Sequence, residues 1–312
     1  MDRRSRIGLL LGGPSSEREV SFKSGKACAE ALRRKGYDVV EIDVGPKLAA
    51  DLTREKVEVA FNILHGKWGE DGCVQGLLEV MGIPYTGAGV TASAVAMDKI
   101  LSKLIFADAG IPIAPHIVIT QGNIPDQIDM EFPVVVKPAT EGSSVGISIV
   151  TKPEDFRDAA KIALKDDKRA LVEKYIRGRD IQAAVLNGEA IGIVEVRPRP
   201  VEGEKISFYD FKHKYTKGMT EYLTKPEDFS DDARKKIEQY SARACEVLGA
   251  EGAARIDFMV DASDQPFILE VNTLPGMTEL SLFPMIARDW AGLSFDDLVE
   301  RILLSARLKM GA

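Results

Sequence analysis

The sequence predicts an α/β domain followed by two α+β domains. A strand–helix–strand pattern opens the chain between residues 7 and 44, which is typical of a parallel sheet. Short apolar runs separated by turn residues follow from residue 132 onward, which favours hairpins. With 312 residues the chain is too long for one ordinary hydrophobic core. We place the domains at residues 1–95, 96–180 and 181–312.

Composition limits the classes of function. The chain is 45% hydrophobic and 29% charged and has no apolar run of about 18 residues, so a protein without a membrane span is expected. The basic start runs directly into a strand rather than a signal-peptide core, which predicts a cytoplasmic location. A net charge of −7 gives no general attraction to nucleic acid. The chain has three cysteines, an odd number, and they are widely spaced, at Cys28, Cys73 and Cys245. This pattern predicts reduced thiols that serve as small packing residues rather than a set of disulfides.

The first strand ends in the glycine pair Gly12-Gly13. A helix is expected over residues 21–35 and a second strand over residues 37–44. The glycine pair lacks the G-x-G-x-x-G spacing of a dinucleotide loop, so a nicotinamide oxidoreductase is a poor interpretation. Glu17 stands where the loop meets the helix, and taken alone it is a carboxylate favoured by the helix dipole.

The third strand, residues 59–64, runs into the sequence L-H-G-K-W-G-E-D-G. Ligands of open α/β sheets collect at the carboxyl ends of strands, so Glu17 and the loop 65–71 are expected to flank one crevice. A lone histidine such as His65 is more often a structural hydrogen-bonding group than a catalyst. A helix is expected over residues 74–81.

The middle of the chain contains a candidate phosphate loop. One helix is expected over residues 92–109, followed by a β run over residues 132–138 that carries Lys137. The loop A-T-E-G-S-S-V-G at residues 139–146 offers backbone N–H groups to a phosphate, with Lys137 adding charge. It is not a Walker loop, because the lysine precedes the glycines, and a plain hairpin turn is the alternative. After a helix at 153–164, backbone groups of the strand 170–176 could contact an adenine edge.

The last third contains strands, a long irregular segment and helices. Strands are expected over residues 181–186 and 190–196, and helices over residues 231–248 and 294–306. The polar and aromatic segment 202–222 has no clear periodicity, which is typical of lids and binding loops.

Between these helices, the segment 256–271 reads as two short strands joined by a turn. Arg255 and Asp257 are two residues apart and so share one strand face, and Glu270 and Asn272 do the same on the second strand. If those faces coincide, the hard oxygen ligands suit Mg²⁺. A solvated edge hairpin with scattered charges is the alternative.

Taken together, the motifs resemble one family over about residues 6–304. They are S-E-R-E-V-S, L-H-G-x-x-G-E-D-G, M-D-K, K-P-x-x-E-G-S-S-V-G, R-I-D and E-V-N-T-x-P-G-M-T, in the order found in the D-alanine–D-alanine ligases of the ATP-grasp superfamily. The resemblance implies a Rossmann-like first domain and two α+β subdomains that hold ATP between them. It also implies that ATP phosphorylates one D-alanine and that the amine of a second displaces phosphate, for peptidoglycan precursor synthesis.

The resemblance also implies roles for individual residues. Two Mg²⁺ ions, with Mn²⁺ as a possible substitute, would be held by Asp257, Glu270 and Asn272. ATP would be bound by Lys99, Lys137, Ser144, Glu173, Ile176, Asp180 and Lys214. Asp180 stands where the family usually has glutamate at the ribose. The amino acids and the oxyanion would be bound by Glu17, His65, Arg255, Gly276 and Ser281. Ser143 and Tyr215 would complete a link to Glu17 that closes the lid. By the same resemblance we expect a homodimer.

Two alternatives within the superfamily stay open. One is a D-alanine–D-lactate ligase, for which the family position at Tyr215 is histidine. Tyrosine stays neutral because its pKa is about 10, whereas a histidine becomes cationic below about pH 6.5 and would repel an ammonium group. His213, two residues earlier, could take that place after a register shift, although Lys214-Tyr215 matches the family pair directly. The other is an ATP-grasp protein that only binds nucleotide, which would have no use for an oxyanion donor such as Arg255.

Overall fold

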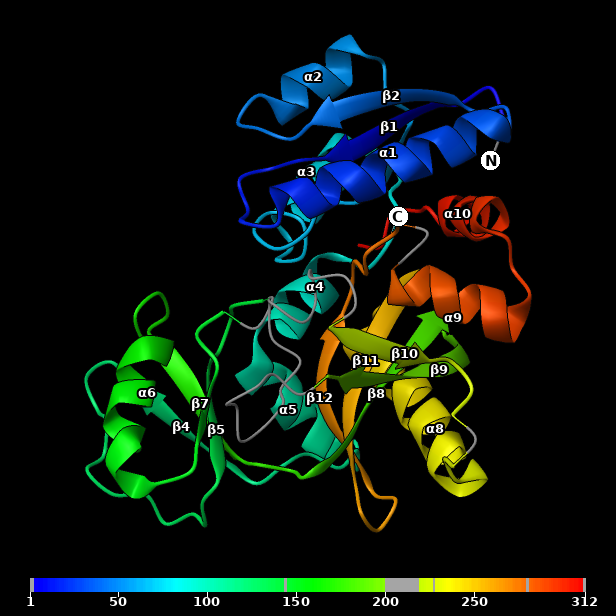
Figure 1. Ribbon diagram of the computed structural model, residues 1–312. Coiled ribbons are helices and arrows are strands. Elements are labelled where there is room, and N and C mark those ends of the chain that lie inside the picture. The colour runs from blue at the N-terminus through cyan, green and yellow to red at the C-terminus, as the bar shows by residue number, and fades with distance from the viewer. Residues whose placement is uncertain (1–2, 143–144, 200–218, 227, 279–280, 311–312) are drawn as a thin grey trace.

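The computed structural model describes residues 3–142, 145–199, 219–226, 228–278 and 281–310. Within these residues the strands form three sheets, each with its own helices (Figure 1). The N-terminal sheet lies at the top of Figure 1, and the other two sheets lie side by side below it. The α/β and α+β prediction is confirmed by this mixture of one parallel and two antiparallel sheets.

The N-terminal sheet is parallel, in the order β2-β1-β3. Its central strand is apolar because both faces are covered, and Leu9, Leu32 and Phe61 are buried between sheet and helices. The predicted β-α-β start is therefore confirmed, with the carboxyl ends of β1 and β3 at the same edge. The elements are β1 (Arg6–Leu11), α1 (Arg18–Arg34), β2 (Asp38–Asp43), α2 (Leu48–Arg54), β3 (Val59–Asn62) and α3 (Cys73–Met81).

The middle sheet is antiparallel, in the order β4-β7-β5-β6. One face packs on α6 through Val134, Phe156 and Val172, which are all buried. The opposite face carries Lys137 on β5 and Glu173 on β7. The elements are β4 (His116–Thr120), β5 (Val134–Pro138), β6 (Ser148–Val150), η1 (Pro153–Asp155), α6 (Phe156–Ala163) and β7 (Arg169–Lys174).

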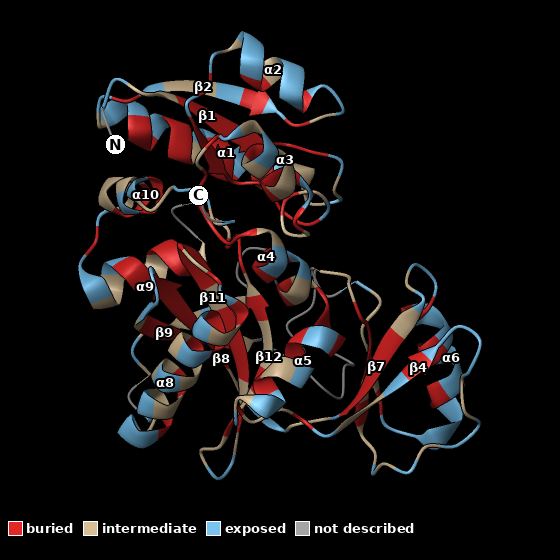
Figure 2. Cartoon of the chain, turned by 180° about the vertical axis from the view of Figure 1, so that it is seen from behind, coloured by how far each residue is buried: buried red, intermediate tan, exposed pale blue. Residues whose placement is uncertain are grey.

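The third sheet is antiparallel, in the order β10-β9-β8-β11-β12. Residues alternate between its faces, so Ile256 and Phe258 pack on the α8 side while Ala184 and Val194 pack on the α9 side. Figure 2 shows these strands buried between the helices. The elements are β8 (Gly178–Leu186), β9 (Glu189–Pro198), β10 (Thr220–Leu223), α8 (Asp231–Leu248), β11 (Ala253–Asp261), β12 (Pro266–Asn272) and α9 (Leu282–Ala291).

The prediction of one continuous helix over residues 92–109 is wrong. The chain forms α4 (Val90–Met97) and α5 (Lys99–Asp108), separated at Asp98, whose φ of −90° and ψ of 103° are extended. The Asp98 carboxylate accepts hydrogen bonds from the N–H groups of Ile100 at 3.0 Å and Leu101 at 3.1 Å. Aspartate is a favoured N-cap residue, so it starts a new helix here rather than continuing the old one. Lys99 consequently lies at the first position of α5.

The C-terminal helix α10 (Phe295–Leu304) packs on α1 of the N-terminal domain. Arg34 is paired with Asp296 at 2.6 Å, and the Tyr37 hydroxyl donates to Glu300 at 3.0 Å. The last part of the chain thus returns to the first domain. Among the elements that the structure describes, α2, α9, β4 and β10 were not predicted from the sequence. The domain limits given above remain a prediction.

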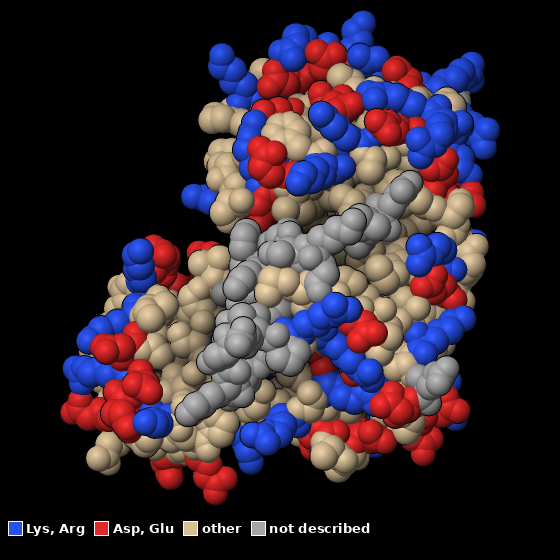
Figure 3. All heavy atoms as spheres, viewed as in Figure 1, with Lys and Arg blue, Asp and Glu red and all other residues tan. Residues whose placement is uncertain are grey.

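The cysteines agree only in part with the prediction made from the composition. The three cysteines are free thiols, and Cys28 and Cys245 are buried as expected, but Cys73 is exposed, so the packing interpretation is wrong there. In the described part of the chain, no helix combines the length and apolar character needed to cross a membrane. On the face drawn in Figure 3, Lys and Arg side chains are interspersed with Asp and Glu.

Candidate active site

Two cavities adjoin the third sheet and share part of their walls. The first cavity, of about 350 Å³, lies between the N-terminal domain and the end of the sheet. The second cavity, of about 420 Å³, lies between the middle sheet and the third sheet. Lys99, Gln182 and Glu270 line both cavities. A group bound in one cavity can therefore meet a group bound in the other at these side chains.

Strands β11 and β12 form the common wall. Asp257 lies directly opposite Glu270, and Arg255 lies opposite Asn272, so the shared face expected from the sequence is confirmed. Arg255 binds Asp257 with two hydrogen bonds, from Nε to Oδ1 at 2.8 Å and from Nη2 to Oδ2 at 2.9 Å. The Asn272 amide donates to the same Oδ2 at 3.4 Å. Gln182 extends this row, because it is the partner of Asp257 on β8.

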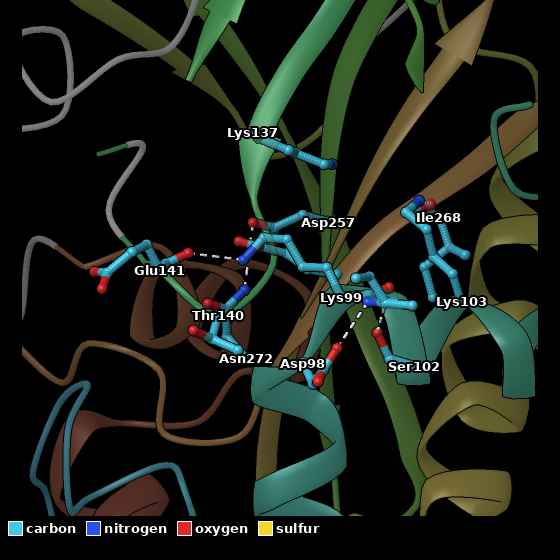
Figure 4. Close-up of polar contacts among 12 residues, drawn as sticks. Asp98, Lys99, Ser102, Lys103, Lys137, Thr140, Glu141, Asp257, Ile268 and Asn272 are labelled. Carbon is cyan, nitrogen blue, oxygen red and sulfur yellow. Dashed lines mark hydrogen bonds and ion pairs between the residues drawn. The ribbon is translucent and has the colours of Figure 1, made fainter. Parts of the chain in front are cut away.

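Lys99 carries a positive charge into this wall. Its Nζ lies 3.3 Å from Glu270 Oε2 and donates to the Glu141 carbonyl at 2.8 Å. Figure 4 shows the Lys99 side chain extending to Glu141, with Asp257 and Asn272 beside it. Glu270 therefore has a protein cation as a partner in this structure. The helix break at Asp98 directs Lys99 over β12, which the sequence pattern did not reveal.

The donor set of this wall suits a hard divalent cation. Among the described residues no cluster of three or more His, Cys, Asp or Glu side chains could hold a metal. Two adjacent carboxylates, Asp257 and Glu270, and the amide oxygen of Asn272 are nevertheless oxygen donors of the type that Mg²⁺ takes when phosphates and water complete its shell. Arg255 and Lys99 currently balance the two carboxylates, so a cation entering here would share them with protein side chains.

Glu173 lies buried at the back of the second cavity between two lysines. Its Oε1 is 2.7 Å from Lys103 Nζ, and its Oε2 is paired with Lys137 Nζ. Burial alone would raise the pKa of this carboxyl, but the two ammonium groups outweigh it and hold the pKa at about 2. Lys103 was not among the residues predicted from the sequence. The signal available was a lysine at a core position of the apolar stretch I-L-S-K-L-I-F.

The second cavity is mostly apolar next to Glu173. This composition is typical of pockets that enclose a planar base and orient it with few polar groups. Asp180 also lines the cavity, and its neighbour Arg179 forms an ion pair with the buried Glu195, which Arg197 contacts at 2.8 Å. Apolar or aliphatic lining residues include Ala114, Val135, Ile147, Ile176, Val196, Met259 and Leu269.

In the first cavity, Glu17 and the loop after β3 lie together, which confirms the predicted crevice. A Cβ atom placed on Gly66 would lie 3.3 Å from Glu17 Oε2, and one on Gly142 would lie 3.6 Å from it. The candidate phosphate loop, at Gly142, and the N-terminal domain therefore approach each other at Glu17.

His65 lies in the same cavity as a buried, neutral side chain. Its Nδ1 is 3.0 Å from the Leu274 carbonyl. Because a carbonyl only accepts, Nδ1 carries the proton and Nε2 is an acceptor. Nε2 is buried and has no hydrogen-bond partner among the described residues. Burial lowers the pKa of His65, which keeps this acceptor unprotonated.

Glu70 is a second residue that the sequence analysis did not select. Its Oε2 accepts the Gly66 N–H at 2.7 Å. Burial raises its pKa to about 8, and the nearby charge of Glu17 acts in the same direction. The motif G-E-D-G contained the signal, because it places a carboxylate beside the His65 loop.

Ser281 and Gly276 form the far end of the first cavity. Ser281 precedes α9, and its Oγ accepts the Thr278 N–H at 3.0 Å. A Cβ atom on Gly276 would lie 3.1 Å from this Oγ, so glycine leaves room for the serine hydroxyl. The remaining predicted residues lie outside the described part of the chain, namely Ser143, Ser144, Lys214 and Tyr215, as do His213 and most of the expected lid at 202–222.

Comparison with known proteins gives a consistent result. A family model described as "D-ala D-ala ligase C-terminus" matches residues 105–304, and one described as "D-ala D-ala ligase N-terminus" matches residues 43–88. The chain is 49% identical to a D-alanine–D-alanine ligase of Trichlorobacter lovleyi over 99% of this chain and 97% of that protein. It is also 49% identical to a ligase of that name from Geobacter sulfurreducens, over 99% and 96%.

Solved structures give the same answer for the fold. The crystal structure of a D-alanine–D-alanine ligase from Bacillus anthracis, complexed with ATP, superimposes with a TM-score of 0.82 at 31% identity. The match covers 96% of this chain and 97% of that one. A second structure of the Bacillus anthracis protein gives a TM-score of 0.83 at 32% identity. The predicted fold is confirmed by these neighbours.

Proposed function

Because the chain belongs to the D-alanine–D-alanine ligase family, we propose that its two adjoining cavities bind ATP and two D-alanines and join the amino acids through an acyl phosphate. The chain is an ATP-dependent ligase of peptidoglycan precursor synthesis, as its family is. The observation that carries the proposal is the wall of Lys99, Gln182 and Glu270, which belongs to both cavities. At this wall, the γ-phosphate of ATP bound in the second cavity would lie next to the carboxylate of a D-alanine bound in the first cavity.

The second cavity fits the nucleotide. Its apolar walls would enclose adenine, with Glu173 and the backbone of Ile176 contacting the base and Asp180 contacting the ribose. Lys99 and Lys137 both line this cavity and would contact the phosphates, with Lys99 also belonging to the shared wall. Ser144 and Lys214 complete the proposed set of phosphate contacts.

The carboxylate pair of the shared wall would hold Mg²⁺. Asp257, Glu270 and Asn272 would bind two ions, with Mn²⁺ as a substitute. Bound there, the metal would neutralise triphosphate charge and favour phosphoryl transfer. The ion pairs with Arg255 and Lys99 orient these carboxylates in the structure.

The first cavity fits two small zwitterions. Glu17 would bind the ammonium group of the first D-alanine, and His65 lines the same cavity. Ser281 would bind the carboxylate of the second D-alanine. Attack of the second amine on the acyl phosphate forms a tetrahedral oxyanion, and the phosphate leaves when that oxyanion collapses.

Arg255 and the backbone N–H of Gly276 would stabilise the oxyanion. Both residues line the first cavity, and Arg255 lies beside the shared wall. Donors of this kind are worth about 3 kcal/mol each in other acyl-transfer enzymes, because they act where negative charge develops. Holding water out of the cavity prevents hydrolysis of the acyl phosphate, which is the role we propose for Ser143, Tyr215 and the lid.

Three further statements belong to the same proposal. The enzyme works in the cytoplasm, where ATP is available. It forms a homodimer, as expected from the family. Its second substrate is D-alanine rather than D-lactate, because a neutral tyrosine at position 215 admits an ammonium group that a cationic histidine would repel.

A competition experiment tests this function. ATP and Mg²⁺ are supplied with D-alanine, D-lactate or both, next to L-alanine as a control, and phosphate release and products are followed from pH 6 to 9. Dipeptide from D-alanine should be the main product at every pH. Depsipeptide as the main product at pH 6 would overturn the choice of second substrate, and phosphate release with no dipeptide would overturn the ligase function.

A further inference from the structure

Lys103 is a fully buried lysine that is not among the described residues lining either cavity. Its Nζ lies 2.7 Å from Glu173 Oε1 and donates to the Ile268 carbonyl at 3.3 Å. Figure 4 shows Lys103 beside Ile268, on the same helix as Lys99. The two lysines are four residues apart, so one face of α5 delivers one ammonium group to the shared wall and one to the interior behind it.

Packing alone gives no reason for a lysine at this position. Removing two opposite charges from water carries a large desolvation cost, and apolar side chains of similar volume often stabilise a core as well or better. A methionine would fill the space without that cost. The charge of Lys103 therefore calls for a role that an apolar residue could not perform.

The charges around Glu173 indicate that role. Glu173 contacts both Lys103 and Lys137, and Lys137 lines the second cavity. One carboxylate with two ammonium groups leaves one positive charge in the cluster. If Lys103 were absent, Glu173 and Lys137 would neutralise each other, and the wall facing the phosphates would lose its net charge.

We propose that Lys103 is a positioning residue for nucleotide binding: it is the counter-ion of Glu173, and it thereby leaves the charge of Lys137 available to the phosphates of ATP. This inference rests on the proposed function, in which Lys137 contacts phosphate. The Glu173 carboxylate can then contact the adenine base without cancelling the positive charge of Lys137, which contacts the phosphates.

Three variants separate this role from simple packing. Lys103→Met removes the charge and keeps the volume. Lys103→Met combined with Glu173→Gln removes both charges and returns the cluster to one positive charge, on Lys137. Lys161→Met removes an exposed lysine of α6 and controls for the change in total charge. For each variant the dissociation constants of ADP and of adenosine are measured by competition against a fluorescent nucleotide, together with the thermal midpoint.

The expected result is an ADP affinity about tenfold weaker in Lys103→Met, with adenosine affinity changed less than twofold, because adenosine has no phosphate. Because Glu173 is also a proposed contact of the base, the double variant is judged by the ratio of its ADP affinity to its adenosine affinity. This ratio should be higher than in Lys103→Met, and the double variant keeps the test available if the single variant fails to fold. Lys161→Met should match the wild type. ADP affinity within twofold of the wild type in Lys103→Met would overturn the proposal. So would equal losses for ADP and adenosine, or a ratio of ADP to adenosine affinity in the double variant that is no higher than in the single one.

These binding measurements are independent of ligation. If the wild-type protein binds ADP but forms no dipeptide, the proposed function fails, while the role of Lys103 is still tested by the ADP and adenosine constants. If dipeptide forms and the Lys103→Met variant binds ADP normally, the inference fails alone.

Discussion

Arg255 and Asp257 stand two residues apart on β11, and their side chains form a two-point ion pair, with Nε–Oδ1 and Nη2–Oδ2 distances of 2.8 and 2.9 Å. The pair is mostly buried between the two cavities. One residue is a proposed oxyanion donor and the other a proposed metal ligand. The ion pair therefore places the proposed metal ligand, which serves phosphoryl transfer, beside the proposed oxyanion donor, which serves peptide-bond formation.

Replacing Arg255 by lysine should lower kcat by about 100-fold or more, because one ammonium group cannot bind Asp257 at two points and reach an oxyanion as well. Steady-state kinetics with ATP and D-alanine check this. Arg243→Lys, which alters an exposed pair with Glu246, is the matched control and should leave kcat unchanged. A kcat for Arg255→Lys within threefold of the wild type would refute the assignment.

Glu270→Gln should abolish turnover and weaken Mn²⁺ binding in the presence of ADP, while leaving the circular dichroism spectrum unchanged. The amide keeps the shape of the side chain but removes the charge that pairs with Lys99 and that would hold the proposed metal. Manganese binding is measured by electron paramagnetic resonance, so the result does not depend on activity. Near-normal activity and metal affinity in this variant would show that Glu270 is not a ligand.

The N-cap at Asp98 should make a measurable contribution to stability. Asp98→Ala removes the acceptor for the Ile100 and Leu101 N–H groups and should lower the free energy of unfolding by about 1–2 kcal/mol. Asp98→Asn keeps an N-cap side chain and loses only the ion pair with Arg169, so it should be destabilised less. Urea unfolding of both variants decides the point, and equal losses would contradict the capping account.

Glu70 should make stability depend on pH. Its pKa is raised from 4.5 to about 8 in the folded protein, so the folded state holds a proton that the unfolded state has lost between these values. For this group, stability is greatest below pH 4.5 and falls as the pH rises through 8. The loss is on the order of 1–3 kcal/mol, because Glu70 is only partly buried.

Glu70→Gln mimics the protonated carboxyl and should remove this decline. The measurement is the free energy of unfolding of both proteins at several values between pH 5 and 9. The difference between wild type and variant should grow as the pH rises. Parallel curves would show that Glu70 is already ionised at pH 5 in the folded protein.

The local features of the site could be predicted from residue spacing. The side-chain alternation of a strand has a period of two, so the sequence determines that Arg255 and Asp257 share a face, and the register with β12 then brings Glu270 to Asp257. The strand–helix–strand start likewise placed Glu17 and the His65 loop at one sheet edge.

Features that depend on tertiary contacts could not be predicted. An apolar helical pattern continues through Asp98, and only the contacts of its carboxylate show that a new helix begins there. The pairing of Lys103 with Glu173 joins positions far apart in the chain and has no local signature. The same holds for Lys99 and Glu270, whose meeting depends on the direction of α5.

The most direct test of the central claim follows the carboxylate oxygen of the first substrate. D-alanine labelled with ¹⁸O in its carboxylate is incubated with the protein, ATP and Mg²⁺, and the released phosphate and the peptide product are analysed by mass spectrometry. Because the acyl phosphate transfers one carboxylate oxygen to the leaving group, labelled phosphate should form in step with D-alanyl-D-alanine. Dipeptide with unlabelled phosphate, or labelled D-alanine recovered without dipeptide, would contradict the account.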